Sequence, residues 1–356
     1  MRTLIRPTGF VDSPFGHDGK VARLAGGLNW FSAVELITVQ GNRRTATELV
    51  PVAGIEDRFD DALAAQWAAL SAARAPLGLG ERTVRLDQPQ VMGIVNATPD
   101  SFSDGGQFAD AAAAAEAGAR MAAEGAAIID VGGESTRPGA RSVWEGDEIE
   151  RVAPVIKQLA AGGVAVSVDT RKADVMSAAV QAGARLINDV SALTYDERSA
   201  QVAATLNVPV VLMHHQGDPQ TMQDDPRYDD VLVEIYLWLE EGIAAAAGAG
   251  ISRDRILIDP GFGFGKNVGH NLELMNGLAL FHSLGCPLVL GASRKRTIGA
   301  LSNEAPADRR LAGSLAFALK AVEQGAQLIR VHDVAETVQA LRVWRGLRDQ
   351  ALTPRL

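Results

Sequence analysis

The feature that most constrains the fold is a unit that recurs from residue 91 to residue 347: a short apolar segment, a polar turn and a longer segment with helical spacing. The short segments are rich in Val, Ile and Leu on both faces, which is typical of parallel strands covered on two sides. We expect strands at residues 91–95, 128–131, 164–168, 186–188, 208–213, 256–258, 287–290 and 327–331. Eight such units close a barrel, so the prediction is an α/β fold, a (β/α)8 TIM barrel; a doubly wound open sheet is the alternative.

Residues 1–88 do not share this rhythm and contain no chemical motif. Residues 28–39 fit a strand or a short helix, residues 57–74 have helical spacing, residues 75–80 suggest a break, and residues 83–86 fit a small strand. We therefore predict two parts: an N-terminal accessory extension over 1–88, an added layer or an oligomer contact, and a barrel domain over 89–356.

Charge and composition narrow the classes of molecule that the protein is expected to bind and the compartment in which it is expected to act. The formal net charge is −9 over 356 residues, which argues against nucleic acid as a partner. No run approaches the ~20 apolar residues that cross a membrane, and the first residues lack the apolar core of a signal peptide. The single cysteine, Cys286, excludes an internal disulfide and fits a reducing compartment, so we predict a cytoplasmic protein.

Polar or charged side chains follow every expected strand, where the active sites of such barrels lie. They are Asn96, Asp130, Asp169-Thr170-Arg171, Asn188-Asp189, His214-His215, Asp259, Ser293-Arg294-Lys295 and Arg330 with His332-Asp333. Any one Asp or Asn can simply cap the next helix, but Lys295, Arg330 and His332 do not suit that role. We expect the acids Asp169 and Asp259 to be balanced by these cations and by a polar ligand.

Two familiar motifs are excluded at residues 261–266. The glycines fit neither a Walker loop nor a dinucleotide-binding turn, which leaves a flexible loop carrying Phe262 or Phe264 over the mouth. His214-His215 has no HExxH pattern and no cysteine partner, so we expect a neutral histidine that lines the mouth or donates to a carboxylate, rather than a zinc ligand.

Eight motifs carry a resemblance to a known family. In order they are MGIVNATPDSFSDGG, GGESTRPGA, SVDTRKADV, INDVSAL, LMHHQG, ILIDPGFGFGK, LVLGASRK and IRVHDV, and they span the chain from about residue 90 to its end. Together they resemble dihydropteroate synthase, a transferase and sulfonamide target of folate biosynthesis. The resemblance implies a pterin-binding TIM barrel that condenses 6-hydroxymethyl-7,8-dihydropterin pyrophosphate with p-aminobenzoate, giving 7,8-dihydropteroate and pyrophosphate. It also implies a Mg²⁺ cofactor and a homodimer.

The resemblance further implies roles for the matching residues. Pterin contacts would come from Asp169, Asn188, Met213, Asp259 and Lys295, of which Asp169, Asn188 and Lys295 would be catalytic. Diphosphate contacts would come from Asn96, Arg137, Arg330 and His332, and Asn96 would also bind the metal. The p-aminobenzoate pocket would use Phe102, Thr136, Pro138, Phe264 and Ser293, with residues 97–108 and 136–143 as mobile covers.

The predicted mechanism is a dissociative, SN1-like substitution at the pterin methylene. The diphosphate leaves, Asp169 stabilises the resulting cation, and the aryl amine attacks. Two rival functions fit part of the pattern: a pterin-binding barrel that passes a methyl group to a corrinoid partner, and a non-catalytic paralogue. The set Lys295, Arg330 and His332 favours a diphosphate substrate and therefore the synthase.

Two positions depart from the resemblance. Arg171 stands where a smaller or aromatic residue is expected, and we expect it to face solvent, with pairing to a nearby acid as the alternative. The N-terminal extension is longer than the family minimum, which concerns oligomer geometry and not the site.

Overall fold

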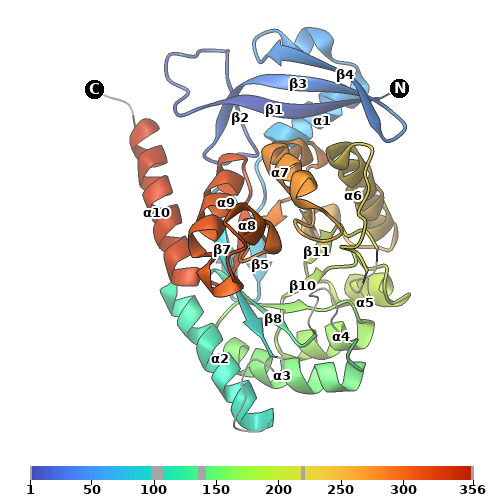
Figure 1. Cartoon of the computed structure of the whole chain (residues 1–356), viewed down its shortest axis with the longest axis vertical. Helices are drawn as coiled ribbons and strands as arrows, with labels where there is room; N and C mark the ends of the chain where they lie inside the picture. The colour runs from blue at the N-terminus through green and yellow to red at the C-terminus, as the bar shows by residue number, and fades with distance from the viewer. Residues whose placement is uncertain (1, 98–106, 135–141, 218–220, 354–356) are drawn as a thin grey trace.

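The structure is a computed structural model that describes residues 2–97, 107–134, 142–217 and 221–353 (Figure 1). Its centre is a ring of eight parallel strands: β7 (Gln90–Asn96), β8 (Ile128–Gly132), β9 (Val166–Asp169), β10 (Leu186–Asp189), β11 (Val210–Met213), β12 (Ile256–Asp259), β13 (Val289–Leu290) and β14 (Leu328–Val331). β14 pairs with β7, and a parallel bridge between Ile258 and Leu288 joins β12 to β13. The ring is therefore closed, which confirms the TIM barrel and excludes the open sheet.

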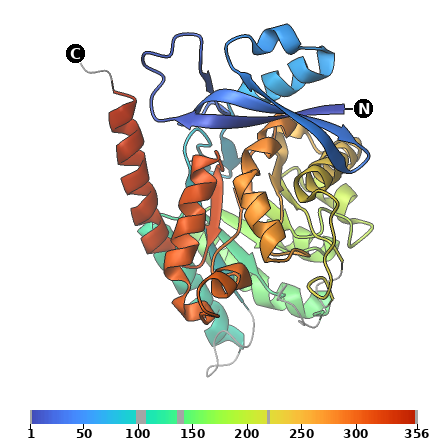
Figure 2. The same cartoon turned by 45° about the horizontal axis from the view of Figure 1, so that its top comes forward.

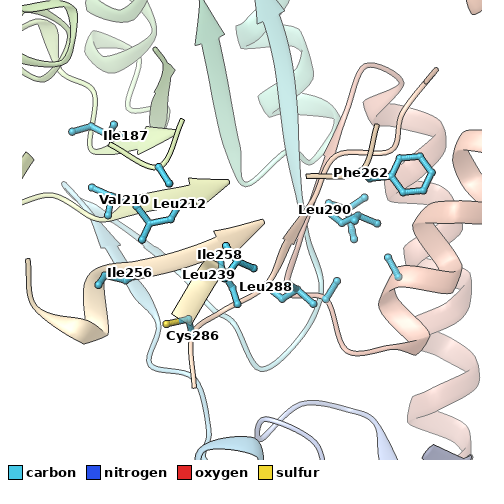
Figure 3. Packing of buried hydrophobic residues seen from close by; sticks show 14 of the residues in the cluster. Ile187, Val210, Leu212, Leu239, Ile256, Ile258, Phe262, Cys286, Leu288 and Leu290 are labelled. Carbon is cyan, nitrogen blue, oxygen red and sulfur yellow. The ribbon is translucent and has the colours of Figure 1, made fainter. Parts of the chain in front are cut away.

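Helices surround the ring. They are α2 (Gln107–Glu124), α3 (Glu145–Ala161), α4 (Ala173–Ala182), α5 (Ser199–Leu206), α6 (Val231–Gly248), α7 (Val268–Asn276), α8 (Arg296–Leu301), α9 (Leu311–Glu323) and α10 (Val334–Ala351), with short 3-10 turns η3 (Arg253–Arg255), η4 (Leu278–Leu284) and η5 (Ala307–Arg309). The outward-facing side chains of the strands pack against them, as Val210, Leu212 and Ile258 do in the cluster that includes Leu239 of α6 (Figure 3). No helix in the described part of the chain is long and apolar enough to cross a membrane.

The first residues form a separate antiparallel layer with its own core. It contains β1 (Arg2–Val11), β2 (Ala22–Arg23), β3 (Trp30–Gln40), β4 (Arg43–Pro51), η1 (Ile55–Arg58) and α1 (Asp61–Ser71). The strand alternative for residues 28–39 and the helix within 57–74 are both confirmed. The sequence did not reveal β4, because only Val50 of its residues is buried and the apolar alternation is missing.

A hairpin of β5 (Leu77–Leu79) and β6 (Arg82–Val84) follows, so the expected break at 75–80 is wrong in part. Its apolar side chains close the bottom of the barrel. Leu77, Leu79, Val84 and Leu86 form one cluster with a layer that takes one residue at each strand: Met92, Ile128, Ala165, Leu186, Val211, Leu257, Val289 and Leu328. The hairpin thus belongs to the barrel core, although it lies within residues 1–88.

The antiparallel layer covers the end of the barrel at which the strands begin. Asn29 Nδ2 donates to the carbonyl of Val322, Arg74 Nη2 to that of His282, and both acceptors lie in segments that lead into strands. Figures 1 and 2 show β1, β3 and β4 lying across this end. The opposite end, at which the strands finish, is left for the site.

Candidate active site

Polar side chains fill the mouth of the barrel, because every second residue along each strand points inward. Successive side chains of a strand alternate between its two faces, so residues two and four positions beyond the apolar bottom layer also point inward. The residues two positions on are Ile94, Asp130, Ser167, Asn188, Met213, Asp259, Gly291 and Arg330, and those four positions on include Asn96, Asp169, Ser293 and His332. One alternation therefore brings most of the predicted site residues into two adjacent layers.

Arg330 lies at the centre of these layers and bridges two acids. Its Nε is 2.6 Å from Asp130 Oδ2, and its Nη2 is 2.7 Å from Asp169 Oδ2. Asn188 Nδ2 donates to the same Asp130 oxygen at 3.0 Å. Burial opposes the charge of Arg330, but the neighbouring carboxylates outweigh it and raise its pKa, so the guanidinium stays protonated. For Asp169, burial raises the pKa and Arg330 opposes the rise.

Two buried oxygen atoms in this region have no hydrogen-bond partner within the described chain: Asp130 Oδ1 and Ser167 Oγ. Asp130 and Ser167 face each other across β8 and β9. An unsatisfied buried polar group costs about 1–3 kcal/mol, so these atoms are acceptors suited to a polar ligand or to water. Sequence reasoning named Asp130 only as a strand end and missed Ser167. Counting back two positions from Asp169 would have found Ser167.

Asp259 and Lys295 lie across the mouth from Asp130 and Asp169, and both contact the loop at residues 261–265. Asp259 Oδ1 accepts a hydrogen bond from the backbone N–H of Gly261 at 2.7 Å, and burial raises the pKa of this carboxyl. Lys295 Nζ donates to the carbonyl of Phe262 and lies 4.0 Å from the centroid of the Phe264 ring. Burial lowers the pKa of Lys295 to about 7. The expected balance of Asp259 by Lys295 is therefore electrostatic, without a direct hydrogen bond between the two described side chains.

Hydrogen bonds from side chains hold the glycine loop at 261–265 in place, whereas the sequence suggested a flexible loop. Gly263 N donates to Asn271 Oδ1 at 2.7 Å, and Gly263 O accepts from Gln223 Nε2 at 2.6 Å. Gly261 has φ +70°, and a Cβ there would lie 1.8 Å from the carbonyl oxygen of His214, so only glycine fits. Phe262 is fully buried against Phe317, which leaves Phe264 as the ring beside Lys295.

His214 is a buried neutral histidine, as predicted, but its partner is a lysine and not a carboxylate. Its Nδ1 is 2.9 Å from Lys266 Nζ, and its ring meets Trp238 edge-on at 4.9 Å. Burial, then the charges of Lys266 and His215, lower its pKa. The described residues contain no group of three or more His, Cys, Asp and Glu placed to hold a metal ion.

The remaining predicted residues divide into two groups. Ser293 and His332 meet at the mouth, where Ser293 Oγ is 3.0 Å from His332 Nδ1; Met213 is buried, and Asn96 is half-buried at the end of β7. Phe102, Thr136, Arg137 and Pro138 lie outside the described residues, as do large parts of the proposed covers at 97–108 and 136–143.

Comparison with known proteins gives the family. The model for "Pterin binding enzyme" matches residues 92–332. The chain belongs to this family. It is 50% identical to dihydropteroate synthase of Escherichia coli K12 over 259 residues, which cover 72% of this chain and 91% of the relative. It is 47% identical to dihydropteroate synthase of Neisseria meningitidis serogroup B over 273 residues, 75% of this chain and 96% of the relative.

Solved structures agree with this membership. Xanthomonas albilineans dihydropteroate synthase with 4-aminobenzoic acid has a TM-score of 0.74 and 50% identity, over 79% of this chain and all of that one. The same synthase with 7,8-dihydropteroate has a TM-score of 0.71, 47% identity and coverage of 78% and 100%. A Yersinia pestis synthase with a sulfonamide drug has a TM-score of 0.73, 46% identity and coverage of 77% and 99%. The protein is therefore an enzyme of the dihydropteroate synthase type, a transferase.

Arg171, one of the positions that depart from the family, contacts an acid and an aromatic ring. Its Nη2 is 3.1 Å from Glu134 Oε1, and its guanidinium lies 3.8 Å from the centroid of the Tyr195 ring. Lys172 Nζ donates to Glu134 Oε2 at 2.9 Å and also to Glu148. The expectation that Arg171 faces solvent is wrong, and the alternative, pairing with a nearby acid, is right. The cause is the buried Glu134, which two cations compensate.

Proposed function

We propose that this protein condenses 6-hydroxymethyl-7,8-dihydropterin pyrophosphate with p-aminobenzoate to give 7,8-dihydropteroate and pyrophosphate. One observation carries the proposal: the acids and the amide suited to a flat heterocycle line the same mouth as Arg330 and His332, the groups suited to a diphosphate ester. A methyl-transferring barrel would need the first group without the second.

The pterin subsite is assigned by matching donors to acceptors. A pterin presents N3–H beside its 2-amino group, and a carboxylate such as Asp259 accepts both hydrogen bonds. Asn188 offers an acceptor and a donor for neighbouring ring atoms, while Lys295 donates to the ring oxygen or nitrogen. Met213 supplies an apolar surface for the ring plane. The unsatisfied oxygens of Asp130 and Ser167 add two acceptors to the same subsite.

The diphosphate subsite uses Arg330 and His332 with the amide of Asn96 and the guanidinium of Arg137. The residues fit a Mg²⁺ ion that is held mainly by its substrate: Asn96 offers an amide oxygen, and Mg²⁺ commonly keeps water and phosphate ligands beside one or two protein oxygens. A bound Mg²⁺ would draw charge from the diphosphate as the ester bond breaks. The p-aminobenzoate subsite combines Phe264 and Ser293 with Phe102, Thr136 and Pro138.

The mechanism we propose is dissociative. Loss of diphosphate leaves positive charge on the pterin methylene and ring, and the carboxylate of Asp169 stabilises that charge electrostatically. Arg330 holds this carboxylate at 2.7 Å and keeps it oriented. The aniline nitrogen is already nucleophilic at neutral pH, so no strong base and no covalent enzyme intermediate are needed.

The test is a product assay on the purified protein with pterin pyrophosphate, p-aminobenzoate and Mg²⁺, read by the mass of dihydropteroate. Asp169→Asn should lower turnover by about 10²-fold or more while pterin still binds, because the amide keeps an acceptor but loses the charge. Near-normal turnover in this variant would remove Asp169 from the mechanism. A wild-type protein that binds pterin but makes no dihydropteroate would favour the non-catalytic paralogue, and methyl transfer to a corrinoid would favour the methyltransferase.

The assembly and the compartment are part of the proposal. We propose a homodimer in the cytoplasm, acting on small molecules and not on nucleic acid or membranes. The free thiol of Cys286 is buried, which suits a reducing compartment. Light scattering of the purified protein would give twice the chain mass for the dimer.

A further inference from the structure

A buried lysine, Lys266, lies behind the site, and no proposed substrate contact accounts for it. Lys266 is 2% exposed, and its Nζ meets three acceptors: His214 Nδ1 at 2.9 Å, the carbonyl of Gly261 at 2.9 Å and the carbonyl of Phe264 at 3.0 Å. Burial lowers the pKa of Lys266, and the charge of Asp259 opposes this; in the ammonium form the side chain has three donors, and each one is satisfied. Nδ1 of His214 can accept because that histidine is neutral.

Two of these acceptors belong to the glycine loop at 261–265. The same loop contacts Asp259 and Lys295, which are proposed to bind the pterin. Gly261 N donates to Asp259, and the carbonyl of Phe262 accepts from Lys295. The two lysines therefore bind different carbonyls of one short loop: Lys266 binds those of Gly261 and Phe264, and Lys295 binds that of Phe262. A shift of the loop would move the partners of Asp259 and Lys295 together.

The loop conformation itself requires such a support. Gly261, Gly263 and Gly265 have φ of +70°, +82° and +63°, in the region that favours glycine. Three glycines give an unbound loop many alternative conformations, so side-chain hydrogen bonds must select one of them. Tyr228 donates to Gly265 O at 2.9 Å, Asn271 accepts from Gly263 N, and Phe264 N donates to Gly261 O at 3.0 Å within the loop. Lys266 adds a side-chain hydrogen bond to the carbonyl of Gly261 and one to that of Phe264.

We propose that Lys266 is a positioning residue for the pterin subsite: it fixes the glycine loop so that the Phe262 carbonyl and the Phe264 ring hold the Lys295 ammonium, and the Gly261 N–H holds the Asp259 carboxylate. The inference rests on the proposed function. It adds a buried residue that acts on substrate binding only through this loop.

The test compares Lys266→Met with Arg74→Met. Both variants lose a buried basic side chain that donates to backbone carbonyls, since Arg74 binds those of Ala69, Ala72 and His282 at the opposite end of the barrel. Both should lower the unfolding temperature. Only Lys266→Met should raise the Kd for 6-hydroxymethylpterin, by about tenfold, because only it releases the loop.

The pH dependence of pterin binding separates positioning from a general loss of stability. Asp259, Asp169, Arg330 and the nearby Lys266 all act on the charge of Lys295, and burial lowers the pKa of Lys295 to about 7, so wild-type affinity should decline above that pH. In Lys266→Met the loosened loop admits water to Lys295, and the like charge of Lys266 is lost as well; both changes raise the pKa of Lys295. The decline should therefore move up by at least one pH unit, and in Arg74→Met it should not move.

A Lys266→Met protein that is folded and has the wild-type Kd and pH curve overturns the inference. If this variant does not fold, His214→Leu removes one of the three acceptors and should raise the Kd about threefold in the same direction; an unchanged Kd there also overturns it. The two proposals fail separately. A wild-type protein without dihydropteroate formation refutes the proposed function, whereas an active wild type with unaltered variants refutes only the role of Lys266.

Discussion

The two ends of the barrel are built from the same strands and have opposite chemistry. At the end at which the strands begin, eight apolar side chains meet the leucines and the valine of the β5–β6 hairpin in a cluster of buried residues. Two residues further along, the inward positions include Asp130, Ser167, Asn188, Asp259 and Arg330. The first end buries apolar surface, which stabilises a fold by roughly 25 cal/mol per Å². The second buries charge, which costs free energy unless it is paired.

The difference explains why the site can hold two unsatisfied oxygens, Asp130 Oδ1 and Ser167 Oγ. Their cost of about 1–3 kcal/mol each is tolerable because the apolar end stabilises the same strands. The antiparallel layer adds to that end and lies away from the mouth. The family model matches residues 92–332, so the antiparallel layer lies outside the part of the chain that it covers.

The largest expected effect comes from removing the guanidinium of Arg330 at the polar end of the barrel. Arg330→Met should lower kcat/KM by about 10³-fold, which corresponds to about 4 kcal/mol. It removes the cation suited to the diphosphate and leaves Asp130 and Asp169 buried without compensation. Steady-state kinetics with both substrates would measure the loss.

The control for the Arg330→Met variant is Arg348→Met. Arg348 donates to the carbonyl of Leu28 at 2.8 Å, far from the mouth, and its loss should cost stability but leave kcat/KM within about twofold. An Arg330→Met enzyme with more than a tenth of the wild-type kcat/KM would show that the mouth does not depend on this cation.

A smaller effect is expected from the apolar end. Leu79→Ala should lower the free energy of unfolding by about 3 kcal/mol, because a 2% exposed leucine in the hairpin would be replaced by a cavity. Urea denaturation measures this, and turnover at 25 °C should stay near wild type. Leu49→Ala, at a 65% exposed position of β4, is the matched control and should change stability by less than about 0.5 kcal/mol. Loss of turnover in folded Leu79→Ala would mean that the two ends are coupled.

The smallest effect is the pH dependence of pterin binding. Because the pKa of Lys295 is lowered to about 7, its ammonium is present below that pH and is lost as the pH rises through it. Affinity for 6-hydroxymethylpterin should fall up to about tenfold per pH unit above pH 7, as fluorescence titration from pH 6 to 9 would show. In Lys295→Arg the side chain stays charged, and the ligand ionises identically, so the difference between the two curves isolates Lys295. Parallel curves would contradict the assignment.

Much of the site was predictable because it follows from strand periodicity. Once the eight strands are placed, Asn188, Asp259 and Arg330 fall two residues beyond the bottom layer, and Asp169 and His332 fall four beyond it. Ser167 follows the same rule and was missed, whereas the other missed features lie outside it. Arg171 pairs with Glu134, which is 37 residues away, and Lys266 binds His214, which is 52 residues away. The hairpin was misjudged because its apolar residues are few and meet their partners only across the closed barrel.

The sequence alone determined the eight barrel strands and the polar character of their carboxyl ends, and it favoured a barrel over an open sheet, because local apolar patterning and the alternation of side chains fix these. Closure of the ring was decided by the pairing of β14 with β7 and by the bridge between β12 and β13. The tertiary structure decided which charges pair, that the glycine loop is fixed and that the hairpin closes the bottom. The physical reason is that hydrogen bonds and ion pairs form over a few ångströms between residues far apart in the chain. No local pattern records which partners the closed ring brings within that reach.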